Sequence, residues 1–342
     1  MASSDAPDAA DAFRTTRPLP DIPGLVFRHL RAPDDYAGMN VIANATRRAT
    51  GDDFTTTDEQ MRAFYDNPGN FDPARDVAVL EIDGRIVGYA RSGTHQELTG
   101  LRVHEVYPFL DPALSPRELL PLMLTAIEDH HRETADSDGK DERVFETFGG
   151  DSAPDREEII LGTGYEAVRF GYSMVRPTLD DLPDAPLPAG LEIREVQPEH
   201  LKQIWDAAME AFRDAWGFSE PTPADYERYL NDPIESDTSL WRIAWDGDEV
   251  AGQVRSYINP VENERYGRLR GYTEEISVRR PWRRRGLARA LIAASFPLLR
   301  ARGMTEAALG VDTENVTGAL RVYEGCGFIP VSRSAVYRKP FD

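Results

Sequence analysis

The sequence predicts two tandem domains of the α/β (α+β) class, each with a central mixed sheet flanked by helices. Three observations predict this architecture. Similar segments recur at nearly one spacing, each half alternates β-prone runs with helix-periodic runs, and a stretch rich in proline and aspartate separates the halves. The chain of 342 residues is long enough for two domains of ordinary size.

The recurring segments are turns that stand beside β-prone runs, and their copies are separated by 163 to 166 positions. The corresponding pairs are Gly24 and Gly190, Asp83-Gly84 and Asp246-Gly247, and Gly164-Tyr165 and Gly327-Phe328. An Asp-Gly pair between two β-prone runs is a strong hairpin signal. Three such pairs at nearly one spacing indicate a duplicated domain.

Each half is predicted to follow the same order of elements. An initial strand, at 26–30 and again at 191–196, is followed by a helical region and the hairpin. A further strand leads into a long helix, at 116–132 in the first half and at 287–302 in the second. A strand, a short helix and a final strand then close the half.

The domain boundaries follow from the repeat and from local composition. The segment 178–188 is predicted to be a linker, which leaves 21–177 and 189–342 as the two domains. The beginning of the chain is rich in Ala, Asp, Ser and Pro, and it lacks the basic start and apolar stretch of a signal peptide. We therefore expect a disordered acidic arm over 1–20 and a cytoplasmic protein.

The composition argues against several classes of protein. A net charge of −20 leaves no general basic surface for nucleic acid, although it could steer a cationic amine or simply favour solubility. No run approaches the ~18–20 apolar residues that span a bilayer. A lone cysteine, Cys326, cannot form an internal disulfide, which fits a reducing compartment. We expect a monomer or homodimer that binds neither nucleic acid nor membranes.

A basic loop in the second half carries the strongest functional signal. A β-prone run ends at Val278, arginines follow, and an apolar helix pattern begins at Leu287. The first amides of such a helix have no carbonyl partner, and Gly286 and Ala288 carry little side chain to shield them. This terminus can accept a phosphate or pyrophosphate, with arginines adding charge-assisted contacts. The alternative is a solvated basic turn before an ordinary helix.

The residues around this loop resemble the GNAT N-acetyltransferases. Arg283-x-x-Gly286-x-Ala288 is similar to the acyl-CoA pyrophosphate loop of that family, and Asn315 and the run 322–328 resemble its downstream asparagine and tyrosine. The resemblance implies a mostly antiparallel sheet whose strands 4 and 5 splay apart, with acetyl-CoA as cosubstrate. The implied cofactor-binding residues are Ile276, Ser277, Val278, Arg283, Arg284, Arg285, Gly286, Leu287, Ala288, Asn315 and Tyr323.

The same resemblance implies catalytic roles. Tyr323 stands where the family's general acid usually lies, and its phenol can donate a proton to a departing thiolate. The alternative is a half-buried aromatic that anchors a short helix. Glu274 and Glu275 are candidate general bases on the strand before Val278; we favour Glu274, although a bulge can change which of them faces the site. Cys326 is expected to be a packed thiol rather than a nucleophile.

The two halves are not equivalent in chemistry. Opposite Gly286 and Ala288 the first half has Glu118 and Leu120, a carboxylate and a bulky side chain where diphosphate would bind. Opposite Tyr323 it has Ile160, which has no ionisable group. We therefore expect the first half to be a degenerate domain that is structural or shapes the substrate site, although it could bind a CoA nonproductively.

The acceptor pocket is expected to come from the helical region 205–230, which is rich in aromatic and acidic residues. These are Trp216, Phe218, Tyr226, Tyr229, Asp206, Glu210, Asp214 and Glu220. They could form a mouth for a cationic amine, or the aromatics could be a core stripe and the acids a solvated face.

No metal site is expected: His130-His131 has no carboxylate or cysteine at ligand spacing, and we place the pair on a helix surface.

The sequence thus predicts direct transfer of an acetyl group from acetyl-CoA to a primary amine of a small molecule. The tandem architecture with a reduced first half resembles that of the mycothiol synthase family, which implies acetylation of a thiol precursor as one alternative. A resistance-type or polyamine acetyltransferase is another. A non-catalytic acyl-CoA-binding sensor is the non-enzymatic alternative.

Overall fold

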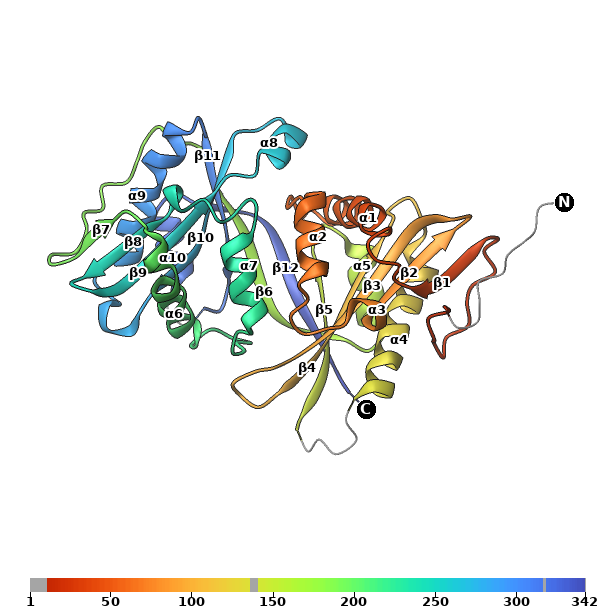
Figure 1. Ribbon diagram of the computed structural model, residues 1–342. Coiled ribbons are helices and arrows are strands. Elements are labelled where there is room, and N and C mark those ends of the chain that lie inside the picture. The colour runs from red at the N-terminus through yellow and green to blue at the C-terminus, as the bar shows by residue number, and fades with distance from the viewer. Residues whose placement is uncertain (1–10, 136–140, 316–317, 342) are drawn as a thin grey trace. The chain divides into compact units, whose positions relative to one another are not determined.

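The computed structural model describes residues 11–135, 141–315 and 318–341, and the chain forms two compact units (Figure 1). The first unit comprises residues 1–168 and 335–342, and the second comprises 169–334. The segment 178–188, predicted to be a linker, lies within the second unit. The division differs from the predicted one because two strands, β6 (Glu166–Arg176) and β12 (Ile329–Pro340), each run from one unit into the other.

The first unit contains a sheet in the order β1-β2-β3-β4-β5, with the end of β12 beside β5. Its strands are β1 (Leu25–His29), β2 (Val77–Ile82), β3 (Arg85–Gln96), β4 (Arg102–Leu110) and β5 (Arg143–Gly150). Its helices are α1 (Tyr36–Ala49), α2 (Asp58–Asp66), α3 (Pro73–Asp76), α4 (Pro116–Thr134) and α5 (Pro154–Gly162). The strand pairs β1–β2, β2–β3 and β3–β4 are antiparallel, whereas β4 and β5 are parallel.

The second unit repeats this plan, with the end of β6 supplying a strand in the order β6-β11-β10-β9-β8-β7. Its strands are β7 (Glu192–Arg194), β8 (Arg242–Asp246), β9 (Glu249–Tyr257), β10 (Arg270–Val278) and β11 (Glu306–Asp312). Its α-helices are α6 (Leu201–Phe212), α7 (Pro223–Asn231), α8 (Pro260–Tyr266), α9 (Leu287–Ala301) and α10 (Ala319–Gly325). Only the pair β10–β11 among these neighbours is parallel, which confirms the mixed, mostly antiparallel sheet.

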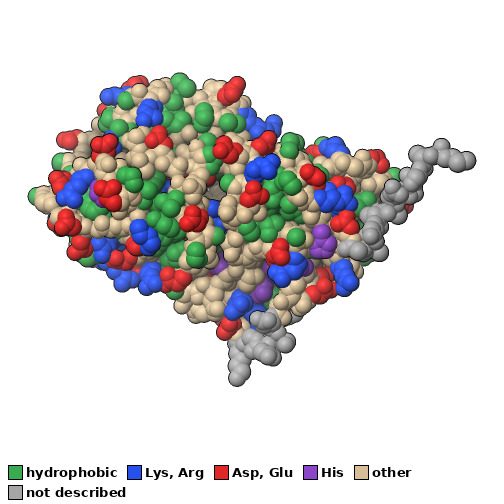
Figure 2. All heavy atoms as spheres, in the orientation of Figure 1, with side chains coloured by type: hydrophobic (Ala, Val, Ile, Leu, Met, Phe, Trp, Pro, Cys, Tyr) green, Lys and Arg blue, Asp and Glu red, His purple; other side chains and the backbone are tan. Residues whose placement is uncertain are grey.

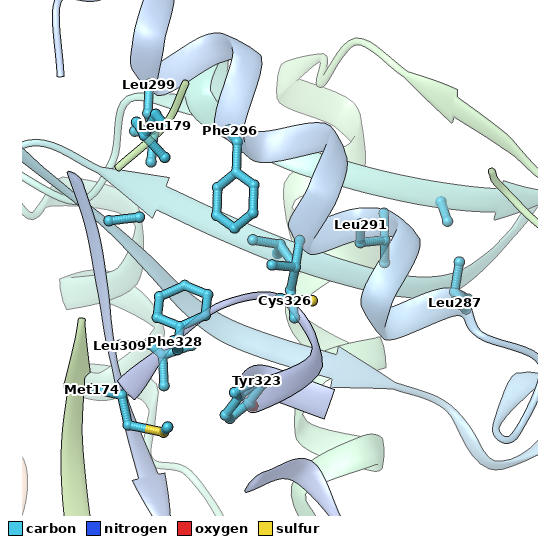
Figure 3. Close-up of a cluster of buried hydrophobic side chains, with 14 of the residues drawn as sticks. Met174, Leu179, Leu287, Leu291, Phe296, Leu299, Leu309, Tyr323, Cys326 and Phe328 are labelled. Atoms are coloured by element: carbon cyan, nitrogen blue, oxygen red, sulfur yellow. The ribbon is translucent and has the colours of Figure 1, made fainter. Parts of the chain in front are cut away.

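The sheet of the second unit is covered on both faces. Successive residues of β8 point to opposite faces: Ala244 packs in the α9 core, whereas Ile243 and Trp245 pack against α6 and α7. Figure 3 shows the α9 core, in which Leu291 and Phe296 lie near Cys326, Phe328 and Tyr323. The sheet of the second unit is therefore held between two apolar cores.

Positions related by the sequence repeat adopt matching backbones. Gly164 and Gly327 have φ of 92° and 86°, and each precedes a buried aromatic ring. The two Asp-Gly hairpins carry the same irregularity: the register shifts between Leu80 and Glu81 in one and between Ala244 and Trp245 in the other. Shared positive φ and shared bulge positions are the structural trace of the duplication inferred from sequence.

The fourth strand differs between the units. In the second unit the pairing of β10 with β11 ends at Tyr272 and Ala308, after which the strands part as expected. There β10 also shifts register against β9 between Glu274 and Ser277. The corresponding strand β4 pairs with β3 from 102 to 110 without a shift. Only the second unit therefore has a bulged strand beside the gap.

The amino-terminal arm differs from its sequence prediction. Residues 1–10 lie outside the described residues, but from residue 11 onward the arm packs on the first unit. Phe13 is buried against Phe27, His29 and His130, and the Thr16 amide and hydroxyl both donate to Asp129 at 2.7 Å. Burial of the Phe13 side chain stabilises the segment by about 1.5–3 kcal/mol, and the hydrogen bonds add to this.

The prediction that His130 and His131 lie on a helix surface is wrong. His131 is buried and contacts His104 and the Glu105 carbonyl at 3.2 and 2.9 Å, and His130 contacts Asp76 at 2.7 Å. The two histidines therefore connect α4 to other elements, His131 to β4 and His130 to α3. Within residues 11–135, 141–315 and 318–341, no group of three or more His, Cys, Asp or Glu side chains is placed to hold a metal ion.

No helix among the described residues has the length and apolar character needed to cross a membrane. Acidic and basic side chains are interspersed over the face seen in Figure 2. No large basic patch appears on that face.

Candidate active site

A cavity of about 390 Å³ opens in the second unit at the start of α9, and it brings together most of the predicted cofactor-binding residues. Predicted residues that line it are Ile276, Ser277, Val278, Arg283, Arg284, Gly286, Leu287, Ala288, Asn315 and Tyr323. Other lining residues include Ala211, Phe212, Asp214, Trp282, Arg289, Ala319 and Val322. Arg285, Glu274 and Glu275 are not among the lining residues. The cavity thus extends from a cationic helix terminus to a phenol.

The amides at the start of α9 face this cavity because of Gly286. This residue precedes the helix with φ of 82°, and no atom lies within 4 Å of where a Cβ would stand. No side chain caps the helix, so the first-turn amides of Leu287, Ala288 and Arg289 have no intrahelical acceptor. Open space, free amides and the positive end of the helix dipole together suit an anion such as diphosphate.

The three arginines of the loop have different roles. Arg283 is used internally: its Nε donates to the Val278 carbonyl at 2.8 Å, and its terminal nitrogens contact the Ala211 carbonyl at 3.0 Å and Asp214 at 2.5 Å. Arg285 reaches the Ala189 carbonyl at 3.3 Å. The expectation that all three would contact phosphate therefore holds best for Arg284, which is exposed and lines the cavity.

Arg283 joins the end of β10 to the end of α6 and so fixes the loop between them. The hydrogen bonds from Arg280 and Arg283 hold the pKa of Asp214 well below its usual range, so this lining carboxylate stays ionised and paired. Because its charge is matched, Asp214 does not present a free negative charge to an incoming diphosphate.

The bulge in β10 places two carboxyl groups beside the gap. Glu275 has φ of 50°, one of three positive values for non-glycine residues in the described ranges; Arg284, with φ of 60°, is another. Glu274 lies opposite Arg255 of β9, and its Oε1 accepts a hydrogen bond from the Gly310 amide of β11 at 2.8 Å. The Glu274 side chain thus bridges β10 and β11 where their backbones no longer pair. Backbone strain of this kind concentrates at functional sites.

Glu274 has the electrostatics of a base that works near neutral pH. Burial raises its pKa from 4.5 to about 8, the Gly310 amide opposes the rise, and Glu275 and Glu235 add to it. Burial also raises the pKa of Glu275, which Arg255 opposes. A carboxylate with a raised pKa accepts a proton more readily than an ordinary one, because its protonated form is favoured.

Tyr323 lies at the far side of the cavity on α10. Its carbonyl accepts the Phe328 amide at 3.1 Å, and the Gly327 amide donates to the Glu324 carbonyl at 2.9 Å, which closes the helix in a Schellman arrangement. Its ring is buried against Phe328. Burial, Glu274 and Cys326 all raise the pKa of Tyr323, so the phenol is protonated at neutral pH. Because Glu274 affects the pKa of Tyr323, a proton donor and a proton acceptor lie within electrostatic range of each other, although Glu274 does not line the cavity.

Comparison with known proteins agrees with this geometry. Residues 202–328 match the family described as the Acetyltransferase (GNAT) family. The second unit therefore contains a GNAT acetyltransferase domain. The matched segment lies wholly in the second unit, the one that contains the bulged strand, the open helix terminus and the cavity.

Relatives extend over both units. The chain is 27% identical over 350 residues to a mycothiol acetyltransferase of Salinispora arenicola, covering 98% of this chain and 99% of the relative. It is 24% identical over 305 residues to that of Geodermatophilus obscurus, covering 86% and 92%. The chain is therefore similar to these proteins along most of their length.

Solved structures show the same fold. A GCN5-related N-acetyltransferase from Sphaerobacter thermophilus superposes with a TM-score of 0.69 at 23% identity, covering 95% of this chain and 97% of that one. A tandem GNAT protein from the clavulanic acid biosynthesis pathway superposes with a TM-score of 0.62 at 15% identity, covering 93% and 99%. The tandem GNAT fold inferred from sequence is confirmed.

The start of α4 in the first unit differs from the start of α9 in the second. Helix α4 has 19 residues where α9 has 15, so about one extra helical turn occupies the place of the phosphate loop. The extra turn begins with Pro116, which has no N–H, and carries Glu118. Leu120 is fully buried in the core, as is Ile160 opposite Tyr323. These features disfavour an anion at the start of α4.

The acidic mouth considered for the acceptor is not present in that form, because its acids are paired. Asp206 contacts Lys202, Glu210 contacts Arg279 at 2.8 Å, and Glu220 contacts Arg213. The aromatic rings of Tyr226 and Tyr229 pack with Trp205 as a core stripe. Tyr226 and Tyr229 thus pack in the core, whereas the Trp216 side chain is 38% exposed.

Sequence reasoning missed three residues of this GNAT site. Arg289 lines the cavity from the first turn of α9, two residues after the helix begins at Leu287. Arg255 and Glu235 lie near the bulge, but they come from β9 and from the segment before β8. No local pattern connects those segments to Glu274, so only the fold brings them together. Cys326 is buried and burial raises its thiol pKa, as befits a packed side chain.

We expect Arg283→Lys to lower the free energy of unfolding of the second unit by about 2–4 kcal/mol, because one ammonium cannot replace the guanidinium's three separate contacts. Urea unfolding followed by tryptophan fluorescence measures this directly, since all five tryptophans lie at 205–282, within the second unit. Arg285→Lys is the matched control and should shift stability little. Equal urea midpoints for the two variants would contradict the role assigned to Arg283.

Proposed function

We propose that the second unit transfers an acetyl group from acetyl-CoA to a primary amine of a small molecule by direct attack. The observation that carries the proposal is one cavity with two different ends. One end has the unshielded amides of α9 together with Arg284 and Arg289, which suit a diphosphate. The other end has Tyr323, electrostatically coupled to Glu274.

The residues between these ends suit the remainder of the cosubstrate. Ile276, Ser277 and Val278 line the cavity on a stretch of β10 that no longer pairs with β11. Such a strand edge can exchange hydrogen bonds with the amides of an extended pantetheine arm. Val322 and Ala319 of α10 form an apolar wall opposite, and Asn315 adds a polar group.

We assign the proton transfers as follows. Glu274 takes one proton from the acceptor ammonium, and the amine nitrogen forms a bond to the thioester carbonyl carbon. The carbonyl re-forms as the carbon–sulfur bond breaks, and the second proton lost by the nitrogen passes to solvent, from which the Tyr323 phenol is restored after it has acted. Tyr323 then donates its proton to the departing thiolate. The raised pKa of Glu274, about 8, suits the first task, and the raised pKa of Tyr323 keeps its phenol protonated for the second.

The likeness to mycothiol acetyltransferases over nearly the whole chain favours one acceptor class as a second candidate, namely the amine of a thiol precursor. In either case we assign the first unit a structural or substrate-shaping role, since the start of α4 lacks the loop that the cosubstrate needs.

We expect Tyr323→Phe to lower kcat about a hundredfold or more while leaving the acetyl-CoA affinity within about threefold, because the variant keeps the ring and loses only the acid. Release of free CoA from acetyl-CoA with a panel of small amines measures turnover, and calorimetry measures affinity. Collapse of acetyl-CoA affinity in the variant would make Tyr323 structural. Tight binding with no turnover of any amine by the wild type would favour the sensor.

We expect kcat/KM to rise with pH through about 8, because Glu274 must be deprotonated to act and its pKa is about 8. Glu274→Gln should lower the rate and abolish this rise, whereas Glu275→Gln, the neighbouring control, should retain it. A pH profile unchanged by Glu274→Gln would assign the base to another residue.

The same pKa affects stability independently of turnover. A folded-state pKa above the unfolded value means that folding favours the protonated form, so the contribution is fully present below the unfolded pKa and is lost as pH rises through about 8. Wild-type stability should therefore fall between about pH 5 and about pH 9 more steeply than that of Glu274→Gln.

A further inference from the structure

Arg255 is a buried guanidinium without a hydrogen-bond partner. It is 7% exposed, and its guanidinium carbon lies 4.3 Å from the ring centre of Tyr229 and 4.3 Å from that of Trp241. Within the described part of the chain it donates no hydrogen bond and joins no ion pair. Arginine has five N–H donors and no acceptor, and it stays charged when buried. Its buried Nε therefore lacks the oxygen partner that buried donors normally have.

Two carboxyl groups face Arg255 without pairing to it. Glu275 stands in the bulge of β10, and Glu235 lies in the segment between α7 and β8, where the Trp241 indole donates to its backbone carbonyl at 3.3 Å. Arg255 lowers the pKa of both groups, which places it near both. Yet burial dominates: it raises the pKa of Glu235 to about 7 and also raises that of Glu275. Arg255 is thus a cation near both buried acids, and it forms no ion pair with either of them.

A row of polar groups connects this cluster to the cosubstrate cavity. Arg255 pairs in register with Glu274, and Gln253, two residues earlier, pairs with Ser277, which lines the cavity. Gln253 is 1% exposed, and neither its amide nitrogen nor its amide oxygen has a partner among the described residues. Residues two apart on a strand share a face, so Gln253 and Arg255 lie on the same side of β9. Buried amides rarely lack hydrogen-bond partners, so the unsatisfied groups of this row indicate a polar binding site.

We propose that Glu235, Glu275 and Arg255 form the acceptor subsite, and that they select an amine carrying a carbonyl or hydroxyl oxygen close to its ammonium. The carboxylates receive the ammonium, and the Arg255 guanidinium donates to the oxygen. The subsite rests on the proposed function, because it supplies the amine that Glu274 deprotonates. Glu235 and Arg255 act as specificity-determining residues and take no part in proton transfer to the thiolate.

The arrangement disfavours polyamines. A polyamine offers no acceptor to Arg255, and its second ammonium would meet the buried guanidinium as a like charge. An amine with an adjacent oxygen satisfies both kinds of group at once. Electrostatic and hydrogen-bond complementarity of this kind determines specificity, because a ligand without the oxygen leaves the buried donors unpaired.

Glycinamide and isobutylamine form a matched pair of probes, since they have the same shape and differ in the carbonyl oxygen and amide nitrogen. We expect wild-type protein with bound CoA to bind glycinamide about tenfold or more tightly than isobutylamine, as measured by NMR titration. In Arg255→Gln the ratio of the two affinities should fall to about one. In Glu235→Gln both affinities should fall, with the ratio retained.

Three controls separate a specific effect from misfolding. Tryptophan fluorescence in urea reports whether each variant's second unit is folded, and calorimetry should give the wild-type acetyl-CoA affinity for all of them. Arg255→Lys keeps the charge in a smaller head group and should retain part of the preference. If Arg255→Gln fails to fold, Arg255→Lys and Glu235→Gln are used to test the proposal.

The outcomes distinguish this inference from the proposed function. Equal wild-type affinity for glycinamide and isobutylamine overturns the subsite, even if amines are acetylated. A preference for glycinamide that survives in both Arg255 variants also overturns it. Absence of amine acetylation by the wild type, with the preference for glycinamide intact, would instead overturn the proposed function and leave the subsite standing.

Discussion

The parting of β10 from β11 beyond Tyr272 and Ala308 is the constraint on which the site depends. Paired strands satisfy their backbone groups with each other and leave no room between them. Once they separate, those groups need other partners. The Glu274 carboxylate supplies one by accepting from the Gly310 amide, and the parted edge of β10 is left to line the cavity. The bulge at Glu275 follows from the same need, because it redirects the strand away from its neighbour.

The opening is stabilised by contacts outside the cavity. Arg283 connects the end of β10 to α6, the Schellman turn after α10 fixes Tyr323, and the cores on either face of the sheet hold both elements in place. Positive φ at Glu275 and Arg284 shows that the backbone is strained at the site rather than in the cores. The first unit has neither the bulge nor the open helix start. Its strand β4 pairs with β3 without a register shift, and its helix α4 is longer than α9.

Much of this could be predicted from sequence, because the signals are local. The positions of α4 and α9, the Asp-Gly hairpins and the loop around Gly286 are encoded by residues adjacent in the chain. What sequence could not give depends on contacts between distant segments. The burial of His131 depends on His104, and the roles of Arg283, Arg255 and Glu235 depend on partners from other elements. The crossing of β6 and β12 between units was hidden for the same reason: a strand's sequence does not say which sheet it joins.

The central claim is that the start of α9 binds the diphosphate of acetyl-CoA, and calorimetry of Gly286 variants tests it most directly. Because Gly286 has φ of 82°, any side chain there strains the backbone, so Gly286→Ala serves as the control for strain. The wild type should bind acetyl-CoA, Gly286→Ala somewhat more weakly, and Gly286→Glu at least about tenfold more weakly than Gly286→Ala, because a carboxylate would repel the diphosphate. Affinity of Gly286→Glu equal to that of Gly286→Ala would contradict the account.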